Sequence, residues 1–253
     1  MASLQSTIAL GGPSLAADVE AGLAAVEAKL AAAVSSPDQL VADASAHLLR
    51  SGGKRLRPLL VLLAAQLGRG VNDQVVDAAV VVELTHLASL YHDDVMDDAP
   101  LRRGAPSAHQ VYGPSLAILT GDLLFAKASQ IVAGLGPEMV RLQAETFERL
   151  CLGQIHETAG PGASDDPIAF HLQVLADKTG ALIAASAHFG ALLGGAAPAA
   201  AAAVVAYGEA AGVAFQLADD LLDLTAPSAV SGKTPGTDLR EGVPTMPVLL
   251  VQQ

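Results

Sequence analysis

Two stretches of closely spaced aspartates are the residues of this 253-residue chain best suited to chemistry. The first, DDVMD at Asp93–Asp97, ends an apolar run, Val76–Met96, that contains no Gly or Pro. The three- and four-residue apolar spacing of this run predicts a buried helix that ends before Pro100. Anions there meet the negative pole of the helix dipole, at a cost on the order of 0.3–1 kcal/mol each at exposed sites. A solvated acidic helix end tolerates this cost, but carboxylates that close an apolar helix favour a bound cation.

The stripe of this helix that carries the first and last aspartates also carries a histidine. At about 100° per residue, Asp93 and Asp97 align with His86, and Asp94 lies beside them. Hard carboxylate oxygens at this spacing suit Mg²⁺, which binds through one or two carboxylates, several waters and substrate phosphates. We therefore predict a magnesium site at the end of this helix.

The second stretch, FQLADDLLDL, also places polar residues along one face of an apolar helix. They occupy positions i, i+3, i+4 and i+7: Gln216, Asp219, Asp220 and Asp223. Ionised carboxylates in an apolar setting need partners or a metal. Each stripe alone is weak support, since acidic helix faces are usually solvated. If the two stripes face one cavity, they form a metal cage.

Basic residues gather at two places in this acidic chain. In GGKRLRP, three basic residues, Lys54, Arg55 and Arg57, follow a glycine pair, and Arg102 and Arg103 follow the first aspartate motif. The first group fits a helix C-cap with cations that complement the dipole, and equally an anion site where Arg and Lys grip phosphate. The second group either neutralises the acidic helix end or holds the far oxygens of a metal-bound ligand.

Composition predicts an all-α fold. Hydrophobic residues make up 51% of the chain and aromatic residues only 3%, so Ala, Leu and Val build the core. Sheets would need more β-branched and aromatic runs. Besides the aspartate helix, we expect helices at Pro13–Val34, Asp38–Leu49, Leu59–Leu67, Pro106–Val132, Pro137–His156, Ile168–Leu193 and Ala199–Leu224. Lys178-Thr179-Gly180 lies inside one of them, where a glycine costs about 1 kcal/mol, so an unwound turn that presents Lys and a hydroxyl is expected there.

Charge and cysteine content limit the partners. The formal charge of −12 argues against nucleic acid, which needs a basic surface, although a local basic site can still bind a small polyanion. The single Cys151 excludes an internal disulfide framework and fits a cytoplasmic location. Residues 1–14 lack the basic and apolar regions of a signal peptide and are expected to be a flexible leader. The apolar tract at 181–206 is interrupted by His, Gly and Pro, so we expect no transmembrane span.

Together these motifs resemble the trans-isoprenyl diphosphate (polyprenyl) synthases. The resemblance extends over nearly the whole chain and keeps the order of the motifs: GGKRLRP, ELTHLASLYHDDVMD, LRRG, GD, KTG, FQLADDLLD and GKTPGTDLREG. It implies a single isoprenoid-synthase domain over 1–253, built as a bundle of about ten or more helices around a central cavity, and a homodimer. Members of the family usually continue through further helices beyond the position of Gln253, and many carry a Lys where this chain has Val243.

The resemblance also implies a reaction, the condensation of isopentenyl diphosphate with an allylic diphosphate. It assigns the isopentenyl diphosphate to Lys54, Arg57, His86 and Arg103. It assigns the allylic diphosphate to Arg102, Lys178, Thr179, Gln216 and Lys233, bridged through Mg²⁺, three ions in all, to Asp93, Asp97 and Asp219. Asp94, Asp220 and Asp223 complete the two motifs.

Small residues before the first motif predict a long product, geranylgeranyl or longer. Ala88 and Ser89 stand where the family closes the pocket with a bulky side chain to make short products, and Phe125 is expected to form a deeper floor. Alternatively, both residues are small so that two helices can pack closely. A class I terpene cyclase would share the metal chemistry but would not need GGKRLRP. A non-catalytic partner subunit would be expected to lack one aspartate motif, and both are present.

Overall fold

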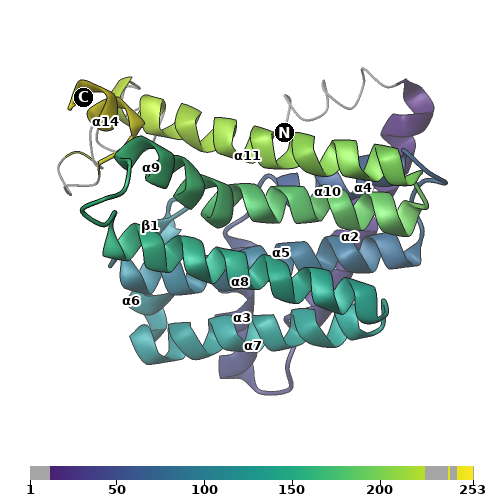
Figure 1. The fold of residues 1–253 in the computed structure, drawn as a ribbon. Helices are drawn as coiled ribbons and strands as arrows, with labels where there is room; N and C mark the ends of the chain where they lie inside the picture. The colour runs from purple at the N-terminus through teal and green to yellow at the C-terminus, as the bar shows by residue number, and fades with distance from the viewer. Residues whose placement is uncertain (1–11, 226–238, 240–243, 253) are drawn as a thin grey trace. The chain divides into compact units, whose positions relative to one another are not determined.

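The computed structural model describes residues 12–225, 239 and 244–252, and these are almost entirely helical (Figure 1). The helices are α2 (Pro13–Ala33), α3 (Gln39–Arg50), α4 (Leu56–Ala65), α5 (Asp73–Met96), α6 (Ala108–Tyr112), α7 (Pro114–Ala133), α8 (Pro137–Ala159), α9 (Pro167–Leu175), α10 (Ala181–Gly194), α11 (Pro198–Thr225) and α14 (Met246–Val251). A π turn (Ala176–Gly180) joins α9 to α10, and a two-residue hairpin, β1 (Leu101–Arg102) and β2 (Ala105–Pro106), follows α5. The predicted all-α class is confirmed.

The described chain divides into two compact units. The first comprises Met1–Ala144 and Ala185–Val204, and the second comprises Glu145–Ala184 and Val205–Gln253. The expected central cavity and the single domain stay predictions. Of the expected leader, residues 1–11 lie outside the described residues, and α2 begins at Pro13, inside the leader's predicted range.

Helix α5 forms the core of the first unit. Asn72 caps its N-terminus by accepting a hydrogen bond from the Val75 backbone N–H at 3.0 Å. Because α2, α4 and α7 all pack against it, its side chains are buried on every face from Val75 to Ala88, except at Asp77 and His86, which are half-buried (Figure 1). The prediction of a buried helix that ends before Pro100 is therefore confirmed, and it extends three residues further toward the N-terminus than expected.

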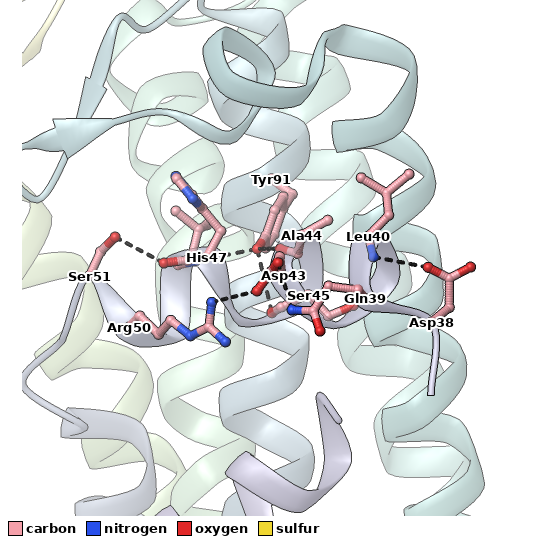
Figure 2. Close-up of polar contacts among 11 residues, drawn as sticks. Asp38, Gln39, Leu40, Asp43, Ala44, Ser45, His47, Arg50, Ser51 and Tyr91 are labelled. Atoms are coloured by element: carbon pink, nitrogen blue, oxygen red, sulfur yellow. Dashed lines mark hydrogen bonds and ion pairs between the residues drawn. The ribbon is translucent and has the colours of Figure 1, made fainter. Parts of the chain in front are cut away.

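Helix α3 is fastened to this core by Tyr91 of α5 (Figure 2). The fully buried Tyr91 hydroxyl donates to the Ala44 carbonyl at 2.5 Å and accepts from the Leu48 backbone N–H at 3.3 Å. Burial raises the pKa of Tyr91 to about 12. Asp38 caps the start of α3, and Arg50 pairs with Asp43 at 2.9 Å on its exposed side (Figure 2). This attachment holds α3, which ends just before the GGKRLRP segment, against α5.

The predicted single helix over Pro106–Val132 is wrong. Gly113 has φ 84°, a conformation that favours glycine, and Pro114 begins a new helix. The segment is therefore divided into β2, the short α6 and α7. The predicted helix over Ile168–Leu193 keeps its extent, but its Lys-Thr-Gly turn is a widened π turn instead of an unwound one.

Three of the described helices are long and apolar enough to cross a membrane, judged by length and composition alone: Asp73–Met96, Pro114–Ala133 and Pro198–Leu222. In α5, 72% of the most apolar 18-residue stretch is buried inside the protein, so packing in the core accounts for its hydrophobic composition. The corresponding shares are 33% in α7 and 17% in α11. The absence of a transmembrane span stays a prediction.

Candidate active site

The first aspartate motif closes α5 in the first unit. Asp93 is half-buried in the last turn, and the exposed Asp97 is the C-cap residue. Asp94 points into the protein and is fully buried, with Oδ1 accepting from Arg102 Nε at 2.7 Å and lying 2.5 Å from Nη2. Asp94 Oδ2 has no hydrogen-bond partner among the described residues. The motif therefore presents Asp93 and Asp97, while Asp94 holds Arg102.

A basic cluster lies beside this motif in the same unit. It consists of Arg55 and Arg57 from the start of α4, His86 from α5, and Arg102 and Arg103 from the hairpin. Arg103 Nη1 donates to the Leu48 carbonyl at 3.2 Å and to the Gly52 carbonyl. A Cβ on Gly53 would lie 2.7 Å from Arg55 Nη1 and 2.9 Å from Arg103 Nη1, so a side chain there would displace the ends of the two guanidinium groups. Gly53 thus leaves space for the basic cluster, whereas a Cβ on Gly52 would meet nothing within 4 Å, and the anion site stays a prediction.

Burial and mutual repulsion perturb the titration of the cluster. Burial, opposed by the attraction of Glu83 and aided by the charge of Arg103, lowers the pKa of Arg57 to about 10. Burial, with Arg57 and Arg103 next in effect, holds the pKa of His86 well below its ordinary value. Arg57 Nε is buried and has no hydrogen-bond partner among the described residues. A cluster of cations with an unused buried donor is suited to bind an anion.

Glu83 of α5 supplies a negative charge within the cluster. It is 2% exposed, and its Oε1 accepts from Arg55 Nη1 at 3.1 Å. Burial raises the pKa of Glu83, against the attraction of Arg55 and of the other arginines around it. Sequence reasoning missed Glu83, although a lone carboxylate in the apolar run VVVELTHL signals a buried partner.

Near the predicted product-length residues, α5 and α7 approach closely. Ala88 is fully buried, and a Cβ on Gly121 would lie 3.1 Å from the Ala88 carbonyl and 2.4 Å from His92 Nε2. The Phe125 ring lies 6.0 Å from the His92 ring. Gly121 thus marks close helix packing, and the small size of Ala88 has a packing reason. Ser89 is half-buried and keeps its predicted role open.

In the second unit, consecutive residues of the π turn contact different helices. Lys178 Nζ donates to Glu157 of α8, and Thr179 Oγ1 donates to Gln216 Oε1 of α11 at 3.3 Å. The structure therefore brings together three residues assigned to the allylic diphosphate, namely Lys178, Thr179 and Gln216. It adds one carboxylate that sequence reasoning missed. That carboxylate, Glu157, lies where it can hold Lys178 in the absence of a diphosphate.

The second aspartate motif lies on the last turns of α11. Asp219 is exposed, whereas Asp220 is 5% exposed, with Oδ2 lying 3.1 Å from His171 Nε2 and accepting from the Met246 backbone N–H at 3.5 Å. The side chain of Asp223, together with Lys233 and Val243, lies outside the described residues. That the two motifs face one cavity stays a prediction.

The acidic residues present are suited to a divalent ion held partly by its ligand. Among the residues the structure describes, no three His, Cys, Asp or Glu side chains converge to hold a metal ion by themselves. Mg²⁺ bound through one or two carboxylates, waters and substrate phosphates needs no such group. Asp93 and Asp97 offer two hard oxygen donors one turn apart beside a cation cluster, and this combination fits a metal diphosphate.

Comparison with known proteins shows which family the chain resembles. The sequence pattern of the polyprenyl synthetase family matches residues 38–253. The nonaprenyl diphosphate synthase of Mycobacterium tuberculosis is 45% identical over 249 residues, which cover 98% of this chain and 74% of the relative. Component 2 of the heptaprenyl diphosphate synthase of Geobacillus stearothermophilus is 42% identical, over 90% of this chain and 71% of the relative.

Solved structures of similar proteins include ligands of the expected kind. The geranylgeranyl pyrophosphate synthase of Corynebacterium glutamicum, solved with calcium and isoprenyl diphosphate, superposes with a TM-score of 0.85 at 44% identity. The match covers 96% of this chain and 74% of that protein. The chain therefore belongs to the polyprenyl synthetase family, the trans-isoprenyl diphosphate synthases, and is a prenyltransferase.

Proposed function

We propose that this prenyltransferase condenses isopentenyl diphosphate with an allylic diphosphate in a Mg²⁺-dependent reaction, to a product of geranylgeranyl length or longer. The observation that carries the proposal is the basic cluster beside the first aspartate motif, with the unused buried Nε of Arg57. A diphosphate supplies the charge and the acceptors that this cluster lacks. A terpene cyclase, which ionises one diphosphate only, would leave this second anion site without a use.

The two diphosphates are assigned to chemically different sites. Lys54, Arg57, His86 and Arg103 bind isopentenyl diphosphate without a metal, and His86 binds as a neutral donor because its pKa is depressed by burial and the nearby arginines. Arg102, held by Asp94, reaches toward the allylic diphosphate. The proposal gives the isopentenyl diphosphate a permanent, preformed cation site.

Lys178, Thr179, Gln216 and Lys233 complete the allylic site, and Asp93, Asp97 and Asp219 would hold Mg²⁺ there, three ions in all. When bound, the metal ions would neutralise the diphosphate as it leaves. Lys178 exchanges Glu157 for a phosphate oxygen, and Thr179 and Gln216 orient the group. The isopentenyl double bond then attacks the allylic carbon, and the proton lost passes to the departing diphosphate, so no protein base is needed.

Assembly and location are part of the proposal. The exposed apolar side chains of Ile118 and Leu119 on α7 support a homodimer, since large apolar groups on a surface helix favour association. The single cysteine supports a cytoplasmic location. Light scattering after size exclusion tests the dimer, and a monomer at micromolar concentration would contradict it.

The reaction is tested with radiolabelled isopentenyl diphosphate, candidate allylic primers and Mg²⁺, with products separated by chain length. We expect turnover that stops in excess chelator and falls by orders of magnitude in Asp93→Asn and Asp219→Asn. Asp98→Asn is the matched control, because this exposed carboxylate is next to the motif but outside the stripe. Turnover that survives the chelator, or a product no longer than farnesyl diphosphate, contradicts the proposal.

A further inference from the structure

The helix that carries Lys178 and Thr179 is widened at these residues. Leu175, Ala176 and Ala181 keep right-handed helical backbone angles, so α9 and α10 continue one another through the π turn at Ala176–Gly180. A π turn inserts an extra residue into a helix at the expense of regular i to i+4 bonding, and such turns are frequent at functional sites. The turn persists only where its surroundings hold it.

Asp177, inside this turn, is anchored at both carboxylate oxygens. It is 7% exposed, Oδ1 accepts from Arg149 Nε at 2.7 Å, and Oδ2 accepts from Gln173 Nε2 at 2.8 Å. A buried carboxylate without such partners would be costly, so these contacts determine where Asp177 lies. The backbone of the turn is fixed with it.

Arg149 of α8 connects the turn to α11. Its Nη2 donates to Glu209 Oε1 at 2.6 Å and to the Ala176 carbonyl at 3.4 Å, while its Nε donates to Asp177 Oδ1. Burial alone would lower the pKa of Arg149, but the hydrogen bonds to Glu209 and Asp177 raise it above its ordinary value. Only the planar fork of arginine can serve two carboxylates in this way. We refer to Arg149, Gln173, Asp177 and Glu209 as the Arg149 clamp.

The turn is also pressed between the two helices that the clamp joins. A Cβ on Gly153 of α8 would lie 2.7 Å from the Lys178 backbone nitrogen, and a Cβ on Gly212 of α11 would lie 2.7 Å from the Gly180 Cα. Backbone therefore meets backbone on both sides of the turn. Any shift of the turn along either helix would require these contacts to break.

Within the clamp, Arg149 and Glu209 lie about two helical turns from Glu157 and Gln216, the groups that contact Lys178 and Thr179. Glu157 is eight residues beyond Arg149 on α8, and Gln216 is seven residues beyond Glu209 on α11. At 1.5 Å per residue, this is roughly 11 Å along each helix. Arg149 therefore affects Lys178 and Thr179 through the turn, without touching their ligand.

We propose that Arg149 is a positioning residue of the allylic site: by holding Asp177 and Glu209 it fixes the π turn in the register that presents Lys178 and Thr179 to the diphosphate. This inference rests on the proposed assignment of the allylic diphosphate to Lys178 and Thr179. The clamp is preformed in the absence of substrate, so it orders the turn before the diphosphate binds.

The test compares Arg149→Met and Asp177→Asn with wild type in steady-state kinetics and in amide hydrogen exchange of residues 176–180. We expect Arg149→Met to lower kcat/KM for the allylic substrate roughly 10- to 100-fold, the effect of a small misplacement. KM for isopentenyl diphosphate should stay within about twofold, because its site is built from other residues. Exchange at the turn should accelerate. Asp177→Asn keeps the Gln173 hydrogen bond and should act in the same direction, but less.

Two controls make the result decisive. Arg50→Met removes an exposed arginine paired with Asp43 on α3 and should change neither kinetics nor exchange at the turn. Lys178→Ala should reduce the same kinetic parameters as Arg149→Met. If Arg149→Met gives no folded protein, Arg149→Lys takes its place, because one ammonium group keeps the charge but cannot form the fork.

The outcomes distinguish the role of the Arg149 clamp from the assignment of the allylic diphosphate to Lys178 and Thr179, on which that role rests. A strong effect of Lys178→Ala with no effect of Arg149→Met on the allylic substrate overturns the clamp alone. An inert Lys178→Ala overturns the allylic assignment, and the clamp's role falls with it. A lower melting temperature in Arg149→Met with both KM values and kcat unchanged shows that Arg149 is merely structural.

Discussion

Replacing Arg102 with methionine should destabilise the protein much more than replacing Asp94 with asparagine. Asp94 is fully buried, and Arg102 is the cation paired with it, with 30% of the arginine side chain exposed. Removing one partner of a buried pair costs about 3–5 kcal/mol, and the partial exposure of Arg102 favours the lower end, about 3 kcal/mol. In a chain of this size, this corresponds to a fall in melting temperature of roughly 6–12 °C.

Asp94→Asn removes the other partner with a different consequence. It loses a charge-assisted hydrogen bond of about 1.5–3 kcal/mol. It also relieves the burial of a charge whose Oδ2 lacks a partner among the described residues, and the repulsion of an anion at a helix C-terminus, about 0.3–1 kcal/mol. We therefore expect stability within about 1 kcal/mol of wild type, since these opposing effects are of similar size.

Urea unfolding followed by far-UV circular dichroism measures both variants and the double variant. The double variant should recover most of the loss seen in Arg102→Met, because no buried carboxylate is left unpaired. Turnover should fall in all three variants, since Arg102 is either absent or no longer held. Equal losses of stability in the two single variants, or additive losses in the double variant, would refute the account of Asp94 as the anchor of Arg102.

Three further predictions concern the substrate sites. In steady-state kinetics, Lys54→Ala and Arg57→Ala should mainly raise KM for isopentenyl diphosphate, while Lys178→Ala should act on the allylic substrate and lower kcat as well. If both sets of variants impaired only the use of the allylic substrate, the assignment of the two sites would be wrong. Because the pKa of His86 in the fold lies below its unfolded value of about 6.5, the unfolded chain binds the proton more readily, and stability should be lost as pH falls below about 6.5. His86→Gln should flatten this part of the stability profile measured by urea unfolding, and an unchanged slope would assign it to another group. In the chain-length assay, Ser89→Tyr should shorten the product and Phe125→Ala should lengthen it. Ala88→Tyr should instead destabilise the fold by about 1–3 kcal/mol, because it overpacks the contact with α7. A product length that responds to neither Ser89 nor Phe125 would contradict the prediction that these residues set the product length.

The sequence was sufficient for the fold class, the family and most helices, because apolar periodicity and the breaks at Gly and Pro are local signals. The helix predicted over Pro106–Val132 failed at Gly113 and Pro114, a helix-stop and helix-start pair that is visible in the sequence but was overlooked. The hairpin that carries Arg102 and Arg103 has strands of two residues, too short for an alternating pattern to show. The π turn could be anticipated as an irregularity at Gly180, but not as a widening.

Contacts between distant residues were beyond reach of the sequence. Arg55 meets Glu83, and Arg149 meets both Asp177 and Glu209, across 28 to 60 residues of chain. Nothing in the spacing of these residues specifies their partners. The predicted site residues came from the motifs, whereas the residues that hold them became visible only through packing.

The two aspartate motifs show how much of a site the packing decides. In both, the second aspartate is buried and paired with a cationic or potentially cationic side chain: Asp94 with Arg102 and Asp220 with His171. The first aspartate of each pair is less buried, because Asp93 is half-buried and Asp219 is exposed. Adjacent residues of a helix point about 100° apart, so a DD pair at the edge of an apolar face sends one carboxylate inward and leaves the other outward. The inward carboxylate costs too much to bury alone and therefore recruits a partner, whereas the outward one remains accessible to an ion. A motif written with identical letters thus contains two kinds of aspartate, one that anchors a neighbouring side chain and one that lies nearer the surface, where we expect it to face the ligand.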